Sequence, residues 1–384
     1  MNKHSQNTNG VRLPVIDALR GLALAGIVWV NAAYFAAPWG LVKPGGAVDA
    51  FADWATLTFA TGKFFPLFSF LFGLGLGVAA AGEQGADRRV RRRLGALVVG
   101  GGLHAVLLFN GDILLLYGVI GWLVWRMRGA TNRTLMRRAA WAGALGVVLQ
   151  ALIMVPWELP AAPQAVAGVG YLGSYADSIG ARVGELPYVA IVLASFNGGM
   201  AMAAILLGLV VGRRGLPVTA TGGLIEPKRW RLLMVGGLVL SAAGAAGLRA
   251  EGAGVALALG SAFVWSLATP LVALGWFCGL WRVLASRLEC WPVRTLTRLG
   301  SMSLSAYLAH SLVLGLLFHG WGLGLHGAFG WSEVVLSAWG VFGLLLIGAA
   351  VWRSSISVGP AEMLMKAWVN HGQVIPASGE AHRP

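Results

Sequence analysis

Charged residues and cysteines are both scarce in this sequence. Asp, Glu, Lys and Arg make up 11% of its 384 residues, whereas a soluble domain carries about 25%. So few charges cannot cover the surface of a globule, which excludes a soluble cytoplasmic enzyme, and the high apolar content excludes a disordered chain. The two cysteines, Cys278 and Cys290, are too few for a disulfide framework or a cysteine-rich zinc site.

Long apolar runs are abundant instead. Hydrophobic residues make up 57% of the chain, with 17 Trp and 56 Gly. This composition is typical of helical membrane proteins, in which Trp anchors the interfaces and Gly permits close helix contacts. Ten runs approach or exceed the length of about 20 residues that a membrane span needs: 15–37, 55–81, 94–110, 112–127, 136–156, 188–212, 231–249, 255–281, 300–319 and 332–352. We therefore predict an all-α, polytopic membrane helix bundle of about ten transmembrane helices.

Basic residues concentrate in every second connection between these runs. The clusters lie at 88–93, 126–138, 213–231 and 282–298 and in both terminal segments. The other connections hold only Lys43, Arg182 and Arg249. Because positive loops stay in the cytoplasm, both termini are predicted to be cytoplasmic. Topology and anionic headgroups also account for the net charge of +14, so no nucleic-acid partner is expected.

The alternation of apolar runs and basic clusters divides the chain into four segments. These are a cytoplasmic N-terminal segment (1–14), a six-helix part (15–212), a four-helix part (213–353) and a cytoplasmic tail (354–384). An apolar stripe over 360–371 predicts a short amphipathic helix in the tail, lying on the inner membrane surface. The longest external connection, 157–187, is either a lid over an external cavity or a loose loop.

Polar residues within the apolar runs are the candidate functional residues, because a charge at mid-bilayer costs roughly 2.5–3.5 kcal/mol. Asp17 and Arg20 lie three apart on one helix face. They form an ion pair that lowers the insertion cost, or Arg20 meets a phosphate from the cytoplasm. Asn31 bonds a neighbouring helix or contacts substrate. Lys63 either reaches the outer interface or lines a cavity, and the GLGLG at 73–77 predicts a thin face for helix packing.

His104 is the most informative of these residues. It lies past mid-depth in its helix, and the following Asn110-Gly111 predicts a tight turn that folds Asp112 back toward it. A His–carboxylate pair raises the basicity of the imidazole and fixes its tautomer, which suits a general base or a nucleophile. The alternative is that Asp112 only caps a helix while His104 only bonds within the core.

A second intramembrane histidine, His310, lies near mid-depth of the ninth apolar run. Ser303 and Tyr307 share its helix face at spacings of four and three residues. This polar stripe bonds a neighbouring helix or forms a cavity wall. His319 and His326, at the outer end, are expected to be exposed. The sequence has no HExxH, cysteine pair or carboxylate cluster, so no tight metal site is expected.

Several of these segments resemble the YeiB-like bacterial membrane proteins and their domain of unknown function 418. The resembling segments are Arg12–Gly21 through Asn31, Lys63-Phe64 with Leu71–Leu76, His104 with Gly111–Gly118, Arg298–Leu308 and Gly359–Glu362. The resemblance implies a multi-pass protein of the bacterial cytoplasmic (inner) membrane. It also implies a relation to the transmembrane acyltransferases, which take an acyl group from cytosolic acyl-CoA and deliver it across the membrane.

One feature of the acyltransferase group is matched and another is missing. Asp17, Arg20 and Gly21 match its Asp-x-x-Arg-Gly at the start of the first helix. The lysosomal heparan-alpha-glucosaminide N-acetyltransferase has an external His soon after that helix, but the stretch Ala32–Trp54 has none here. Chemistry in this chain would therefore shift to His104 or His310.

The leading hypothesis is a membrane-embedded acyltransferase with acyl-CoA as donor and no metal. Acyl-CoA enters from the inner face, where Arg20, Arg92 and Arg93 meet its phosphates. His104, oriented by Asp112, deprotonates the acceptor or briefly carries the acyl group.

Other intramembrane polar residues complete this hypothesis. His310 and Tyr307 form the other wall of the site, and Tyr117, Asn31 and Lys63 are further binding candidates. The expected partners are membrane lipids and a small-molecule, glycan or lipid acceptor, and the sequence leaves open a homodimer. The competing hypothesis is a transporter or lipid flippase, in which the buried His, Asp and Lys relay protons or bind substrate without covalent chemistry.

Overall fold

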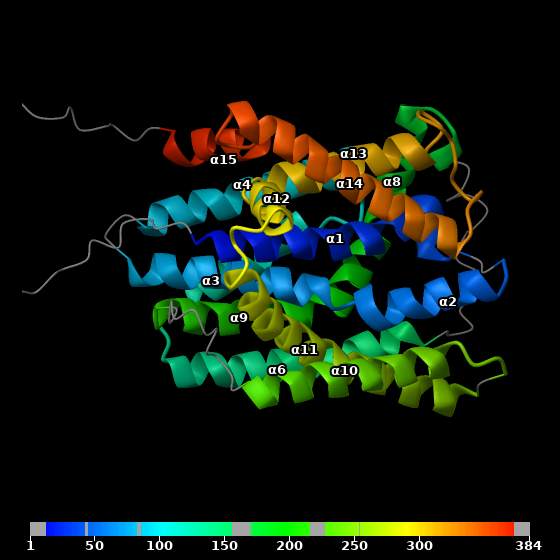
Figure 1. The fold of residues 1–384 in the computed structure, drawn as a ribbon, viewed down its shortest axis with the longest axis horizontal. Helices are drawn as coiled ribbons and strands as arrows, with labels where there is room; N and C mark the ends of the chain where they lie inside the picture. Colours follow the sequence, from blue (N-terminus) through cyan, green and yellow to red (C-terminus); the bar gives the residue numbers. More distant parts are fainter. Residues whose placement is uncertain are drawn as a thin grey trace, which may run out of the picture.

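The computed structural model describes residues 13–42, 45–82, 86–155, 170–215, 227–252 and 254–371, and within these ranges every regular element is a helix (Figure 1). The helices are α1 (Pro14–Ala36), α2 (Ala47–Ala55), α3 (Phe64–Ala81), α4 (Ala86–Leu107), α5 (Ile113–Arg126), α6 (Asn132–Met154), α8 (Tyr175–Leu193), α9 (Gly199–Arg213), α10 (Pro227–Leu248), α11 (Val255–Ala285), α12 (Trp291–Gly300), α13 (Ser303–Phe318), α14 (Trp331–Ser355) and α15 (Pro360–Asn370). Two π-helical turns follow α2 and α8, over Thr56–Ala60 and Ala194–Gly198. The all-α prediction is confirmed.

The described helices are those of a multi-pass membrane protein. Six spans are long and apolar enough to cross a bilayer: Pro14–Ala36, Ala47–Ala81, Tyr175–Arg213, Arg229–Leu248, Val255–Ala285 and Trp331–Ser355. Together α12 and α13 provide a seventh, bent by 87° between them. The count of ten stays a prediction, because α4, α5 and α6, which hold three of the ten apolar runs, do not pass the same test of length and composition.

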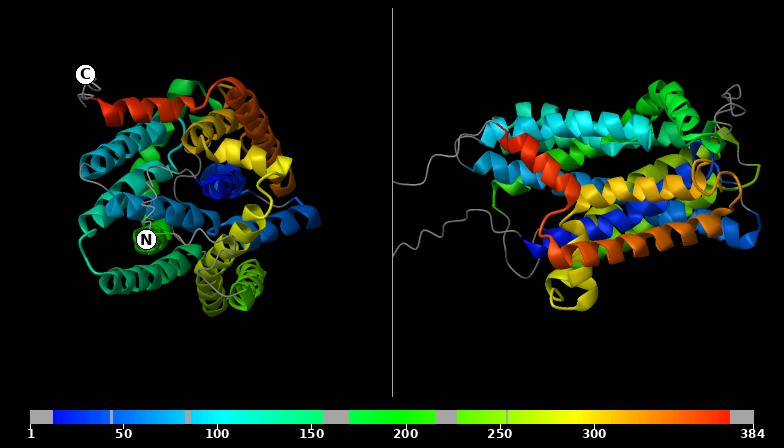
Figure 2. Two further views of the ribbon diagram at one scale, coloured as in Figure 1. Left: turned by 60° about the vertical axis from the view of Figure 1, so that its left-hand side comes forward. Right: turned by 90° about the horizontal axis from the view of Figure 1, so that it is seen from above.

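Helix α1 is the centre of the bundle (Figure 2). It packs against α3, α11, α12, α13 and α14, and 67% of its span is buried, compared with 28% for the span of α10. Pro14 at its first position and Asp17 in its first turn favour helix initiation there. Polar side chains on the buried faces of α1 must therefore find partners on the neighbouring helices.

The predicted external connection at 157–187 is wrong in its second half, because α8 begins at Tyr175. Ser174 and Asp177 form a capping box in which each side chain bonds the backbone of the other residue, and such a box stabilises the start of a helix. The helix continues past Pro187. The first part of the predicted connection, 157–169, lies outside the described residues.

The GLGLG packing prediction is confirmed at two of its three glycines. A Cβ on Gly73 would lie 2.2 Å from the carbonyl oxygen of Ile205, and one on Gly77 would lie 2.4 Å from that of Leu209. Both contacts are with α9, so only glycine permits this approach of the two backbones. Gly75 has nothing within 4 Å of the corresponding position, because it points away from α9.

Helix α12 crosses α1 at similarly close range. A Cβ on Gly21 would lie 2.3 Å from the carbonyl oxygen of Leu296, and one on Gly300 would lie 1.7 Å from that of Asp17. The Asp-x-x-Arg-Gly at the start of α1 therefore includes a glycine that packing requires. The close crossing and the bend after Gly300 direct α13 along α1, with which it is in contact.

A side chain of the tail helix α15 caps the N-terminus of α13. The Glu362 carboxylate accepts hydrogen bonds from the backbone N–H groups of Leu304 (2.8 Å) and Ser305 (3.3 Å), which have no partner within α13. The predicted helix over 360–371 is confirmed, and its exposed apolar side chains are those of Met363, Leu364 and Trp368. Its position on the inner membrane surface stays a prediction.

Basic connections meet at one end of the bundle, which we call the basic end. Arg128, after α5, binds Asp87 at the start of α4 at 2.9 Å, and a hydrogen bond from Trp125 helps to lower the pKa of Asp87. Arg213 at the end of α9 donates to the Ala130 carbonyl at 3.0 Å. The C-terminal ends of α4 and α13 lie at the opposite end of the bundle.

Candidate functional site

A cavity of about 440 Å³ penetrates the bundle from the basic end. It lies between α1, α3, α4, α5, α13 and α15. Three basic residues, Arg20, Arg93 and Lys366, and one acidic residue, Glu362, line its outer part, and Tyr117 and Tyr307 line its deep part. The cavity therefore combines a cationic mouth with an aromatic interior, which suits a ligand that has an anionic head and a less polar tail.

The predicted arginines divide between the cavity and the tail. Arg20 pairs with Asp17 at 3.2 Å and also lines the cavity, so the predicted ion pair does not remove Arg20 from the cavity wall. Arg93 lies in the cavity wall with its guanidinium over the Phe72 ring, 5.6 Å from the centroid. Arg92 points elsewhere and donates to the backbone carbonyl of Val369 at 3.2 Å.

His104 and Asp112 are in contact, as the turn between them predicts. His104 Nδ1 lies 2.7 Å from Asp112 Oδ2, and each residue is 3% exposed. The other carboxylate oxygen, Oδ1, accepts from Leu115 N at 2.6 Å and caps α5. The sequence analysis gives helix capping and histidine pairing as alternative roles of Asp112. In the structure, its carboxylate performs both. A Cβ on Gly101 would lie 2.6 Å from Oδ1, so glycine is needed at that position for the close approach.

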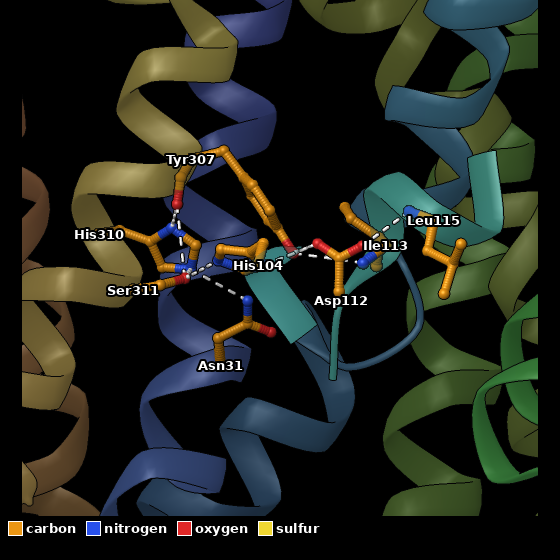
Figure 3. A network of polar contacts seen from close by, with 8 residues as sticks. All are labelled: Asn31, His104, Asp112, Ile113, Leu115, Tyr307, His310 and Ser311. Carbon is orange, nitrogen blue, oxygen red and sulfur yellow. Dashed lines mark hydrogen bonds and ion pairs between the residues drawn. The ribbon is translucent and has the colours of Figure 1, made fainter. Parts of the chain in front are cut away.

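The sequence analysis missed a third member of this group, Ser311. Its hydroxyl lies 2.9 Å from Nε2 of His104, and the residue is fully buried. Asp112, His104 and Ser311 therefore form a continuous chain of hydrogen bonds (Figure 3). The available signal was helical spacing, because Ser311 follows Tyr307 by four residues and shares its face.

Tyr307 separates this group from the cavity. Its ring lines the cavity, while its hydroxyl donates to Asp112 Oδ2 and accepts from Ile113 N, each at 3.3 Å. The cavity thus ends at a side chain that directly contacts the carboxylate partner of His104. His104 does not line the cavity.

His310 and Asn31 are paired beside the same group. Asn31 Nδ2 lies 3.1 Å from His310 Nε2, and His310 Nδ1 contacts the carbonyl oxygen of Tyr307. A carbonyl oxygen can only accept, so Nδ1 carries the proton and Nε2 accepts from Asn31. The predicted bond from Asn31 to a neighbouring helix is confirmed. Of the predicted polar stripe, Ser303 lies in the cavity wall, and His310 is fully buried.

Lys63 occupies a different part of the bundle, and the prediction that it reaches the outer interface is wrong. It is fully buried, donates to the Leu57 carbonyl at 2.9 Å and lies 3.8 Å from the centroid of the Trp265 ring. Leu57 belongs to the π-helical turn Thr56–Ala60, and its carbonyl also accepts from Trp265 Nε1. The Lys63 amine therefore contacts this carbonyl and the face of the indole ring. Lys63 does not line the cavity.

Tyr117, by contrast, lines the cavity and is held in place from behind. Its hydroxyl contacts Ser69 Oγ at 2.9 Å and donates to the Phe65 carbonyl at 3.0 Å. Its ring stacks on Phe72 with centroids 5.7 Å apart. These contacts keep the side chain rigid at the deep end of the cavity.

The prediction that His319 and His326 are exposed is wrong. They are 3% and 7% exposed, and both rings pack on Tyr171, with centroids 4.8 and 5.5 Å away. Burial lowers the pKa of His326, which lies in the connection after α13. The helical turn that contains Tyr171 covers both histidines, and the sequence predicts a loop there.

A second polar cluster lies at the opposite end of the bundle from the cavity mouth. Glu185 accepts from Tyr171 at 2.7 Å and from Asn110 at 2.6 Å. Arg182 donates to the Val106 carbonyl at 2.8 Å and so satisfies the C-terminal end of α4. We call Asn110, Tyr171, Arg182 and Glu185 the outer cluster. Asn110 belongs to the same turn as Asp112.

Comparisons with known proteins match both halves of the chain. Residues 221–371 match the family described as "Protein of unknown function (DUF418)". The uncharacterized protein YxaH of Bacillus subtilis is 27% identical over 93% of this chain and 94% of its own length. The uncharacterized protein YeiB of Escherichia coli is 26% identical over 91% of this chain and 94% of its own length.

The chain is therefore similar to YxaH and YeiB over most of its length, and its C-terminal part matches the DUF418 family. No solved structure matches it. The DUF418 match includes Tyr307, His310 and Ser311, whereas His104 and Asp112 precede it. The residues that meet beside the cavity therefore come from both parts of this YeiB-like chain.

Proposed function

We propose that this YeiB-like protein is a membrane-embedded acyltransferase that moves an acyl group from cytosolic acyl-CoA to an acceptor in or across the membrane. The observation that carries the proposal is the position of the cavity. Its mouth is basic, and its deep wall, Tyr307, hydrogen-bonds the carboxylate that is paired with His104. The topology proposed with it has ten spans in a bacterial inner membrane, with the basic end and both termini in the cytoplasm.

The cavity mouth supports an anionic donor. Arg20, Arg93 and Lys366 line the same space, and guanidinium and ammonium groups are the usual protein partners of phosphate oxygens. The volume of about 440 Å³ lies within the range of roughly 300–1,000 Å³ of small-molecule and cofactor sites. Acyl-CoA fits this chemistry, with phosphates at the mouth and the acyl thioester at the aromatic deep end.

The deep end supports proton transfer. His104 Nδ1 contacts a carboxylate, which leaves Nε2 as the basic nitrogen. An imidazole oriented in this way removes a proton from an attacking group and returns it to a leaving group. Neither step requires a metal ion.

The outer cluster supports an acceptor that arrives from the other side. From His104 toward that end, Phe109 stacks on Phe35 with centroids 4.7 Å apart, and Phe35 stacks on His319 at 5.4 Å. Beyond these rings lie Glu185 and Tyr171, which are polar groups suited to the hydroxyls of a small molecule, a glycan or a lipid headgroup. The aromatic layer then separates the acceptor side from the donor side.

The direct test uses the purified full chain and radiolabelled acetyl-CoA. Specific binding at the basic end, with release of CoA or transfer to an added acceptor, is the expected result. Absence of binding, hydrolysis and transfer, under conditions in which a related acyltransferase is active, would refute the proposal.

Lys63 favours a second candidate function, transport or lipid flipping without covalent chemistry. Acyl transfer gives no role to this buried amine, and intramembrane ionisable residues are typical of substrate and proton pathways. Uptake into vesicles separates the two functions. A His104→Ala variant that loses turnover but still binds acetyl-CoA supports transfer, whereas altered proton-coupled uptake supports transport.

A further inference from the structure

Ser311, His104 and Asp112 have the connectivity of a nucleophile, a base and an orienting carboxylate. The distances are 2.9 Å from Ser311 Oγ to His104 Nε2 and 2.7 Å from His104 Nδ1 to Asp112 Oδ2. Such arrangements occur on unrelated folds and are identified by geometry and roles rather than by sequence order. Here the three residues come from α13, α4 and the start of α5.

The hydrogen bonds determine which atom carries each proton. Asp112 Oδ2 accepts from Tyr307 and faces His104 Nδ1, so Nδ1 donates and Nε2 of the neutral ring has a free lone pair. The Ser311 hydroxyl is the group placed to donate to that lone pair. The neighbouring His310 Nε2 lies 3.5 Å from the hydroxyl and already accepts from Asn31 at 3.1 Å. The serine proton is therefore directed at the base.

The local backbone does not account for this orientation. A serine or threonine inside a helix commonly bonds the carbonyl four residues earlier, and Ser69 and Thr297 both do so at 2.8 Å. For Ser311 the equivalent distance, to the Tyr307 carbonyl, is 3.5 Å. Its hydroxyl thus forms its short contact with the imidazole instead, although the local bond is available.

We propose that Ser311 is the nucleophile of this site and carries the acyl group as an acyl-serine ester, an inference that rests on the acyltransferase function proposed above. Ser311 Oγ attacks the thioester carbonyl, so a C–O bond forms and the C–S bond breaks. His104 Nε2 takes the hydroxyl proton and gives it to the departing CoA thiolate. The acceptor hydroxyl or amine then attacks the ester, and His104 passes its proton to Ser311 Oγ. The second step restores the free serine.

Tyr307 controls access from the cavity to Ser311. Ser311 is fully buried and lies one helical turn beyond Tyr307, which forms the cavity wall. The phenol is held by two hydrogen bonds of 3.3 Å, which are long for hydrogen bonds to a hydroxyl group. Rotation of this side chain opens the passage, and its return shields the ester from water.

The decisive experiment traps the ester in the purified full chain. Labelled acetyl-CoA is added without acceptor, the reaction is quenched in acid, and the acetylated peptide is located by mass spectrometry. We expect acetyl on Ser311, and its loss in Ser311→Ala and His104→Ala. The matched control is Ser266→Ala, which removes a fully buried hydroxyl on α11 that does not line the cavity and should leave the label unchanged.

The Ser311→Cys variant guards against loss through misfolding. It retains a nucleophile of similar size, and its acyl thioester is cleaved by neutral hydroxylamine, whereas the serine ester requires alkaline conditions. A change of label stability at this one position identifies the residue that carries the acyl group. An acetyl label on His104 or Ser303, with Ser311 unmodified, would overturn the inference.

An independent probe separates this inference from the proposed function. A small fluorophosphonate reacts with an activated serine and needs no acyl-CoA. If Ser311 is modified in a His104-dependent manner but acyl-CoA is never used, the nucleophile stands and the acyl-CoA function fails. If Ser311→Ala transfers acyl groups at the wild-type rate, the function stands and the nucleophile fails. We expect instead a loss of at least about 1,000-fold, as for other nucleophile knockouts.

Discussion

Asp112→Asn separates the two roles of one carboxylate. Oδ1 caps α5 through Leu115 N at 2.6 Å, and Oδ2 accepts from His104 Nδ1 at 2.7 Å. An asparagine oxygen caps a helix as well as aspartate does, but its NH₂ group cannot accept from Nδ1–H. We expect the variant to keep the cap and to reverse the tautomer of His104, so that Nε2 carries the proton.

General values for helix caps and buried hydrogen bonds set the expected size of each effect. Loss of a helix cap costs about 1 kcal/mol, and loss of a buried hydrogen bond to a charged group costs about 1.5–3 kcal/mol. Asp112→Ala loses both and should reduce the free energy of unfolding by about 2.5–4 kcal/mol. Asp112→Asn keeps the cap and replaces the charge-assisted bond by a neutral one, so it should lose less. Transfer activity should fall by about 10⁴-fold in Asp112→Asn, because a wrong tautomer disables the base.

Two measurements check these expectations on the same preparations. Thermal or denaturant unfolding in detergent gives the order of stability, which should be wild type, then Asp112→Asn, then Asp112→Ala. The acetyl-transfer rate should be equally low in both variants. Equal stability of the two variants would contradict the capping role, and wild-type activity in Asp112→Asn would refute the assignment of His104 as the base.

Three further predictions concern the cavity mouth, the packing and the topology. Arg93→Ala should weaken acetyl-CoA binding by about 10-fold, as expected when about 1.4 kcal/mol of phosphate contact is lost. Arg88→Ala, an exposed arginine on the same helix, should leave the dissociation constant unchanged, and equal effects of the two would contradict the cavity as donor site. Gly208→Ala places a Cβ 2.3 Å from the Phe70 carbonyl oxygen and should lower the unfolding temperature at a cost of about 1–3 kcal/mol. Gly75→Ala, with nothing within 4 Å, should be neutral or slightly stabilising, and a reversed order would refute the close α3–α9 packing. Cys290 is exposed in a connection predicted to be cytoplasmic, so a membrane-impermeant maleimide should label it in inside-out vesicles and not in intact spheroplasts. The opposite labelling would invert the topology.

Contacts between residues close in sequence were predictable. Asp112 follows His104 by eight residues across an Asn-Gly turn, so helix and turn geometry bring the two side chains together. The thin glycine face at Gly73 and Gly77 and the amphipathic helix over 360–371 follow equally from helical spacing. In each case the period of the helix determines which side chains share a face.

Contacts between residues far apart in sequence were decided by the tertiary structure alone. The bond between His104 and Ser311 joins positions 207 residues apart, and it depends on the glycine-mediated crossing of α12 over α1 and on the bend before α13. The burial of Lys63, His319 and His326 likewise depends on which helices cover them. Composition and periodicity determine that a residue is in a helix and at which depth, but the neighbour across the bundle depends on how several backbones pack at once. The pairing of the predicted base with the proposed nucleophile is a property of that packing.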